Sequence, residues 1–238
     1  NCKKNKNFYK KKMKILCSIC GRKGSKGVKN KNLTLVKNKP LIFYTIQQAK
    51  KSKLFDQIVV STNDKKIQAK AIEYGASCWF LRSNRLSNSS SPKIPVIRDN
   101  LIKSEKYFNS KFEHIIDLDI SAPLRDHFDI RKAYNKFKKF KYDNLFSVNK
   151  SKKNPYFNMV EMRGAKVYLS KNKKKFYSRQ QLPTVYSLNA SIYVWKREAL
   201  LQHNNLIGKK TGIYEMSEEK SIDVDSKFDL KLVKFLMK

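Results

Sequence analysis

The chain of 238 residues is long enough to form one large domain with a substantial core. Its 53 lysines and arginines stand against 19 aspartates and glutamates, and the net charge of +34 suits anionic partners without choosing among nucleotides, nucleic acids and acidic lipids. The cations are spread along the chain without an RNA- or DNA-binding signature, and no apolar run approaches the roughly 20 residues of a membrane span. We therefore expect a cytoplasmic protein with no membrane partner and no specific nucleic-acid partner.

The first twelve residues have no apolar periodicity and differ from the sequence that follows them. We expect residues 1–12 to be a disordered extension and residues 13–238 to form the folded domain. An apolar run at 15–20 predicts the first buried strand. Cys17 and Cys20 lie in this run, and we interpret them as buried apolar residues because no second Cys or His pair follows at the spacing of a zinc site.

A loop broken by glycines follows this strand. Gly24 and Gly27 let backbone amides approach phosphate oxygens without a Cβ in the way. Positive charge in the same loop comes from Arg22, Lys26 and Lys31. The spacing is not that of a Walker phosphate loop. Taken alone, the loop is equally compatible with a phosphate site and with a solvated turn.

Strands and helices alternate through most of the chain. Strands are predicted at 15–20, 56–61, 77–81, 113–119, 145–148 and 187–195. Helices are predicted at 40–49, 64–75, 96–102, 129–140, 197–202 and 227–237. Such βαβ units predict an α/β fold, a mostly parallel Rossmann-like sheet with helices on both faces.

Three segments interrupt or end these units. The serine-rich stretch 82–92 is either a mobile surface loop or a substrate-binding loop. Residues 149–186 contain only short β-like pieces and predict a small β insertion outside the main sheet. The loop 120–125 follows a predicted parallel strand, which is where open α/β sheets bind ligands.

Two aspartates lie close together near the end of the chain. Asp223 and Asp225 are two residues apart, so in an extended segment both carboxylates project to the same side and could face one Mg²⁺. The alternative is an aspartate-rich turn before the last helix. A nearby polyphosphate site favours the metal, because a triphosphate binds with a divalent cation.

Arginine and amide side chains precede the strand at 187–195. Arg179 and Gln180 could clasp a carboxylate or sugar hydroxyls, although a polar turn before a core strand would have the same composition.

In this order the motifs resemble those of the cytidylyltransferases that make CMP-sialic acid and related CMP-nonulosonic acids. The motifs are Arg22-x-Gly24-Ser25-Lys26-Gly27-x-x-x-Lys31-Asn32, Lys39-Pro40-Leu41-Ile42, Val59-Val60-Ser61-Thr62, Phe80-Leu81-Arg82, Pro123-Leu124-Arg125, Arg179-Gln180-x-Leu182-Pro183 and Ile222-Asp223-x-Asp225. The resemblance extends from Met13 to the end of the chain.

The resemblance implies a nucleotidyltransferase that joins CTP to a nine-carbon 2-keto sugar acid and releases pyrophosphate. It implies nucleotide contacts from Arg22, Gly24, Ser25, Lys26, Lys31, Asn32, Arg82 and Ser90. It implies sugar contacts from Asp119, Ser121, Arg179, Gln180 and Asn189. Asp223 and Asp225 would bind Mg²⁺ and, with Arg22 and Lys31, act in catalysis. The insertion at 149–186 would form a homodimer and reach toward the partner's active site.

Two positions depart from the sialic-acid pattern. Asp119 stands where those enzymes usually carry a glutamine, which replaces an amide with a group that only accepts hydrogen bonds. This favours the branch that acts on sugars such as legionaminic acid. Asn189-Ala190 replaces the common Asn-Gly. The alternatives are a cytidylyltransferase for the eight-carbon acid of lipopolysaccharide, a basic nucleic-acid-binding protein and a pseudoenzyme.

Overall fold

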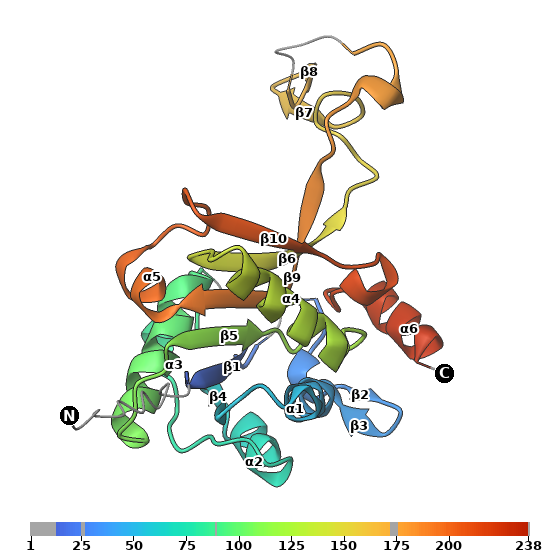
Figure 1. Cartoon of the computed structure of the whole chain (residues 1–238). Helices are drawn as coiled ribbons and strands as arrows, with labels where there is room; N and C mark the ends of the chain where they lie inside the picture. Colours follow the sequence, from blue (N-terminus) through green and yellow to red (C-terminus); the bar gives the residue numbers. More distant parts are fainter. Residues whose placement is uncertain (1–12, 25–26, 89, 172–175, 238) are drawn as a thin grey trace, which may run out of the picture.

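A six-stranded sheet forms the centre of the computed structural model, which describes residues 13–24, 27–88, 90–171 and 176–237 (Figure 1). In spatial order its strands are β10 (Thr211–Glu215), β6 (Asn144–Lys150), β9 (Tyr186–Lys196), β5 (His114–Leu118), β1 (Ile15–Gly21) and β4 (Gln57–Thr62). Only β9 runs antiparallel to its neighbours among these strands. The expected mostly parallel sheet is therefore confirmed. Residues 1–12, with the predicted disordered extension, lie outside the described residues.

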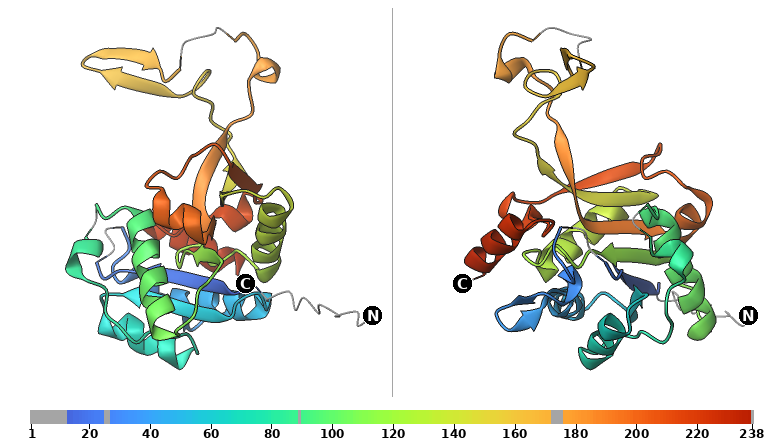
Figure 2. Two further views of the ribbon diagram at one scale, coloured as in Figure 1. Left: turned by 60° about the vertical axis from the view of Figure 1, so that its left-hand side comes forward. Right: turned by 180° about the vertical axis from the view of Figure 1, so that it is seen from behind.

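Helices pack on both faces of the sheet (Figures 1 and 2). One face is covered by α1 (Leu41–Ser52), α2 (Lys65–Glu73), α4 (His127–Lys139) and α6 (Lys227–Leu236). The other face is covered by α3 (Lys93–Tyr107) and α5 (Arg197–Gln202). Side chains along β1 point alternately to the two faces of the sheet. Cys17 and Ile19 belong to the hydrophobic core on the first face, and Leu16 belongs to the core on the second. None of the described helices has the length and apolarity that a membrane span requires.

The start of α6 fixes the segment that carries the two C-terminal aspartates. Ser226 accepts a hydrogen bond from the Asp229 backbone N–H, and Asp229 accepts one from that of Ser226. This reciprocal capping satisfies amides that the helix itself leaves unpaired. Asp229 also accepts from the backbone N–H of Asp225 at 3.1 Å. The cap therefore ties Asp225 to the helix behind it.

Several elements differ from the sequence prediction. Residues 77–81 do not form a regular strand, because they touch β4 only through isolated bridges at Ser77 and Leu81. Strand β10 was not predicted. Gly212 lies within it, where the ring of Tyr142 leaves no room for a Cβ. A hairpin of β2 (Leu35–Val36) and β3 (Lys39–Pro40) precedes α1 and was also not predicted.

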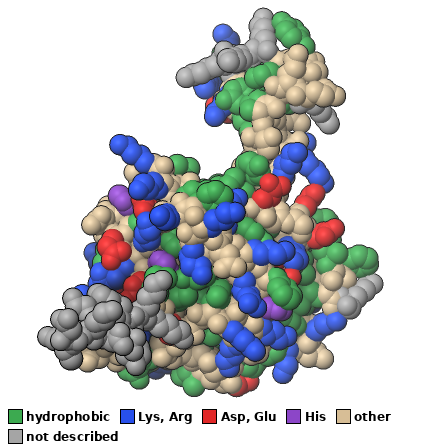
Figure 3. All heavy atoms as spheres, viewed as in Figure 1, with side chains coloured by type: hydrophobic (Ala, Val, Ile, Leu, Met, Phe, Trp, Pro, Cys, Tyr) green, Lys and Arg blue, Asp and Glu red, His purple; other side chains and the backbone are tan. Residues whose placement is uncertain are grey.

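The insertion projects from the body of the protein (Figures 1 and 2). Its stem continues the pairing of β6 with β9 as far as Lys150 and Tyr186. Beyond the stem, β7 (Val160–Arg163) and β8 (Lys166–Leu169) form a separate antiparallel hairpin. All residues of this hairpin are exposed, including several apolar side chains. Figure 3 shows this apolar surface on the projection, and shows lysines and arginines scattered over the body below it.

A strained backbone position lies where the register of β6 and β9 shifts. Ala190 has a φ of +54°, a left-handed conformation that is unfavourable for a residue with a Cβ. We expect Ala190→Gly to stabilise the fold by about 0.5–1 kcal/mol, the relief of this strain less the added entropy of the unfolded chain. Denaturant unfolding measures the change. As a control, Ala133→Gly inside α4 should be destabilising, and a similar loss at both positions would contradict the interpretation.

Candidate active site

A polar cleft of about 570 Å³ lies beyond the carboxyl ends of β1, β4 and β5. The predicted site residues that line it are Arg22, Lys31, Asn32, Arg82, Asp119, Ser121, Asp223 and Asp225. This is the edge where open α/β sheets bind ligands. The structure therefore brings together residues from widely separated parts of the chain.

The loop after β1 is held by its own side chains and by the end of β4. Asn32 is buried, and its amide nitrogen donates to the Arg22 carbonyl oxygen at 3.0 Å. The Lys23 backbone N–H donates to the Asn63 side chain at 2.8 Å. Gly24 has a left-handed φ of +81°, which its lack of a Cβ permits. Ser25 and Lys26, both predicted at the nucleotide, lie outside the described residues.

Gly27 packs directly against the aspartate segment. A Cβ at this position would lie 1.8 Å from the carbonyl oxygen of Asp225, which is a backbone atom. We expect Gly27→Ala to force the loop and this segment apart and to lower kcat/KM for CTP about tenfold or more. Steady-state kinetics test this. Gly208→Ala is the control because Gly208 is exposed and has room for a Cβ; an equal loss in both variants would refute the packing argument.

The carboxylates of Asp223 and Asp225 reach one ammonium group. The Nζ atom of Lys31 lies 2.8 Å from Asp225 Oδ1 and 4.0 Å from Asp223 Oδ1. Between the two aspartates, the buried Val224 donates its backbone N–H to the Ser121 carbonyl oxygen at 2.9 Å. The two carboxylates thus project toward the same side, as their spacing predicts.

These carboxylates suit a hard cation. Asp223 Oδ1 is buried and has no hydrogen-bond partner among the described residues. Burial and then the charge of Asp119 raise the pKa of Asp223. No group of three or more His, Cys, Asp or Glu side chains that could hold a metal occurs in the described part of the chain. Two aspartates are enough for Mg²⁺, because proteins bind this ion through one or two carboxylates together with substrate phosphates and water.

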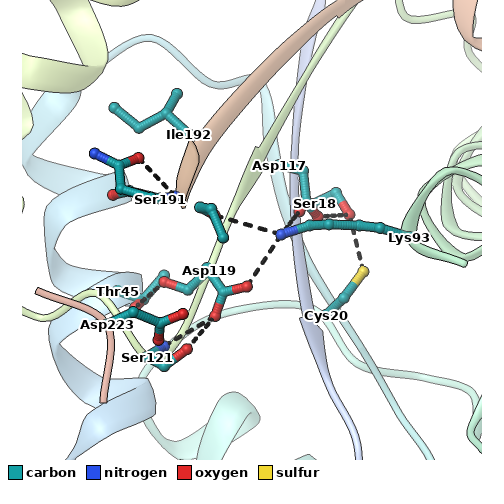
Figure 4. Close-up of polar contacts among 12 residues, drawn as sticks. Ser18, Cys20, Thr45, Lys93, Asp117, Asp119, Ser121, Ser191, Ile192 and Asp223 are labelled. Carbon is teal, nitrogen blue, oxygen red and sulfur yellow. Dashed lines mark hydrogen bonds and ion pairs between the residues drawn. The ribbon is translucent and has the colours of Figure 1, made fainter. Parts of the chain in front are cut away.

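A second charged cluster, which we call the Lys93 cluster, consists of Lys93, Asp117 and Asp119 (Figure 4). Lys93 begins α3, and its Nζ lies 3.2 Å from Asp117 Oδ2 and 3.0 Å from Asp119 Oδ2. Sequence reasoning found Asp119 but not its two partners. Lys93 directly follows the polar stretch at 82–92, and Asp117 lies within a predicted apolar strand, so neither residue indicated a site.

The charges of the Lys93 cluster stabilise one another. Burial by itself would lower the pKa of Lys93, but the charges of Asp119 and Asp117 raise it. Burial would likewise raise the pKa of Asp119, yet Lys93 and hydrogen bonds from Ser121 hold it well below its ordinary value. Asp119 is therefore ionised at neutral pH.

Comparison with known proteins assigns the fold and cleft to a family. The profile of a family described as cytidylyltransferase matches residues 16–236, nearly the whole chain. The chain belongs to the cytidylyltransferase family. This confirms the resemblance inferred from the order of the motifs.

Individual proteins support the same assignment. Post-translational flagellin modification protein B of Campylobacter coli is 47% identical over 224 residues, covering 94% of this chain and 95% of that protein. CMP-N,N'-diacetyllegionaminic acid synthase of Campylobacter jejuni is 46% identical over 223 residues, 94% of each. A solved CMP:2-keto-3-deoxy-manno-octonic acid synthetase complexed with CTP matches with a TM-score of 0.68 at 15% identity, covering 94% and 98% of the two chains. That identity supports the fold alone.

Two further residues predicted at the nucleotide differ in exposure. Arg82 of this cytidylyltransferase is buried, and its Nε donates to Ser87 Oγ at 3.1 Å. Ser90 is exposed and bonds to the side chain of Asn88 through its backbone N–H and its hydroxyl. Asn88 lines the cleft, whereas Ser90 is not among the lining residues.

Two of the predicted sugar-binding residues, Gln180 and Asn189, are not among the residues that line the cleft of the same chain. Arg179 and Gln180 lie in a short 3-10 helix of the projecting insertion, where Gln180 lines a separate cavity of about 390 Å³. Asn189 is buried in β9 and bonds to Ser147 and Ser221. It therefore supports the register shift of β9 rather than the wall of the cleft.

A smaller cavity of about 240 Å³ shares Lys93 with the main cleft. It lies between α3 and β9, and its lining is mostly apolar, with Tyr193, Trp195 and Leu206 among the residues. Trp195 is buried, and its indole N–H has no hydrogen-bond partner among the described residues. The walls of this cavity are therefore mainly apolar.

Proposed function

We propose that this cytidylyltransferase transfers CMP from CTP to the anomeric hydroxyl of a nonulosonic acid of the legionaminic type and releases pyrophosphate. The observation that carries the proposal is the 46% identity, along 94% of both chains, to a CMP-N,N'-diacetyllegionaminic acid synthase. Asp119 adds support, because it replaces the glutamine that the resemblance leads one to expect in sialic-acid enzymes. CTP is a cytoplasmic nucleotide, so we place the reaction in the cytoplasm.

The cations of the cleft would hold the triphosphate. Arg22 and Lys31 line the same cavity, and guanidinium and ammonium groups bind phosphate oxygens strongly. The sugar hydroxyl would attack the α-phosphorus in line with the departing pyrophosphate. Positioned cations stabilise the charge that develops on the phosphate oxygens, so no covalent enzyme intermediate is required.

Asp223 and Asp225 would hold Mg²⁺ on the triphosphate side of the cleft. Bound there, the metal would supply charge neutralisation for the phosphate oxygens. Lys31 pairs with these carboxylates in the protein alone, and its ammonium would turn to the phosphates once substrate is bound.

The sugar acid would lie beside Asp119 and Ser121. The neighbouring cavity suits an N-acyl group, because its apolar walls match a methyl group. We therefore propose that an N-acyl group of the sugar would occupy this cavity.

A second copy of the chain would complete the site. The exposed apolar residues of the insertion include Met159, Val160, Met162, Val167, Tyr168, Leu169 and Tyr177. So many apolar side chains on one projection mark a surface that a partner covers. We propose that the insertions pair in a homodimer and carry Arg179 and Gln180 toward the cleft of the other subunit.

A panel of sugar acids tests the proposal. Purified protein with CTP and Mg²⁺ is assayed for pyrophosphate with N,N'-diacetyllegionaminic, sialic, pseudaminic and 3-deoxy-manno-octulosonic acids. We expect the highest kcat/KM for the legionaminic acid. A preference for the eight-carbon acid, or no turnover with any nonulosonic acid, would refute the assignment.

A further inference from the structure

The ammonium group of Lys93 is bound by other groups of the protein. Its ammonium group lies between Asp117 and Asp119 at 3.2 and 3.0 Å, and the Ala190 carbonyl oxygen lies 3.5 Å away (Figure 4). The ring centroid of Tyr193 lies 4.3 Å away. The ammonium group donates hydrogen bonds to Asp119 Oδ2 and to the Ala190 carbonyl oxygen, and it forms an ion pair with Asp117. Although Lys93 lines the cleft, its ammonium group pairs with the carboxylates of Asp117 and Asp119, and we do not assign it to a phosphate.

Asp119 is held from two sides. Lys93 binds its Oδ2, while its Oδ1 accepts the Ser121 backbone N–H at 3.0 Å and the Ser121 hydroxyl at 2.7 Å. The side chain keeps 26% exposure and lines the cleft, so a substrate can reach it. A carboxylate in this state only accepts hydrogen bonds. A substrate group that contacts it must therefore be an O–H or N–H donor.

We propose that Lys93 is a positioning residue that fixes Asp119 as an acceptor, so that the enzyme selects sugar acids presenting a hydroxyl or amide N–H at this point. The inference rests on the proposed function and assigns the chemistry by which its sugar site discriminates. An amide at residue 119 would donate as readily as accept, and would not enforce this choice.

The buried carboxylate of Asp117 requires a cation beside it. Its side chain is 1% exposed, and its Oδ1 already accepts the Ser18 hydroxyl at 2.8 Å. Its Oδ2 has no hydrogen-bond partner among the described residues, and only the Lys93 ion pair balances it. Without Lys93, Asp117 and Asp119 would face each other as like charges, and Asp119 would turn away or take up a proton.

The test distinguishes a role of Lys93 in positioning Asp119 from a role in the stability of the fold alone. Lys93→Met is combined with Asp117→Asn so that Asp117 is not left as a buried charge without a counterion. Asp119 then keeps its two hydrogen bonds from Ser121 but loses the bond from Lys93 to its Oδ2. With a nonulosonic acid that the wild type uses, we expect KM for the sugar to rise about tenfold or more, with KM for CTP little changed. Lys93→Arg should restore most of the affinity. Lys103→Met is the matched control, since Lys103 lies on the same helix and pairs with Asp99 on the surface.

A second readout uses analogues of the sugar acid that each lack one O–H or N–H donor. The wild type should discriminate most strongly against one of them, and the double variant should lose that discrimination. Unchanged sugar KM, or an equal rise in both KM values, would overturn the inference. If the double variant does not fold, Asp119→Asn with Lys93 intact decides, because it must weaken discrimination against the same analogue. Absence of wild-type turnover would instead refute the proposed function.

Discussion

Asp225→Asn is expected to reduce kcat about 100- to 1,000-fold while leaving the fold intact. The Asp225 side chain is 74% exposed and pairs with Lys31, so its charge contributes little to stability. An amide oxygen is a weaker ligand for Mg²⁺ than a carboxylate, so the triphosphate would lose charge neutralisation where the reaction needs it.

Kinetics as a function of Mg²⁺ concentration measure the loss of kcat, and thermal unfolding measures whether the fold is intact. Glu73→Gln is a suitable control, because Glu73 pairs with Lys70 on the surface of α2, away from the cleft. Wild-type activity in Asp225→Asn would remove Asp225 from the metal site.

Arg125→Met is expected to cost about 3–5 kcal/mol of unfolding free energy, because Arg125 is a buried cation with a full set of partners. The side chain is 1% exposed. It donates to Gln48 Oε1 at 2.9 Å and to the carbonyl oxygens of Ser191 and Asp119. Methionine fills similar space but leaves these acceptors unpaired. The loss would also loosen the loop that carries Asp119 into the cleft.

Guanidinium unfolding with Arg131→Met as the control tests this cost. Arg131 lies exposed on α4, and its replacement should change stability by less than about 0.5 kcal/mol. A loss below about 1 kcal/mol in Arg125→Met would show that the buried network contributes little.

Sequence reasoning works best for local patterns. The apolar run before the loop predicted β1, and the two-residue spacing of Asp223 and Asp225 placed both carboxylates on one side, because each depends on backbone geometry over a few residues. The mostly parallel sheet followed in the same way from alternating strands and helices.

Contacts between distant residues could not be predicted in this way. The pairing of Lys93 with Asp117 depends on how α3 packs on the sheet, and neither residue lies in a sequence pattern that indicates a site. Strand β10 was not predicted, and the packing of its Gly212 against Tyr142 is a tertiary contact. Arg179 lies on a projection for which we propose pairing with a second copy of the chain, and one sequence does not describe such a contact.

The formation of a CMP-sugar is the central claim, and phosphorus NMR tests it most directly. Purified protein is incubated with CTP, Mg²⁺ and N,N'-diacetyllegionaminic acid. We predict that the CTP signals decline while pyrophosphate and one phosphodiester signal appear in equal amounts, and only when both substrates are present. Persistence of CTP, or its conversion to free nucleotide without a phosphodiester, would contradict the assignment.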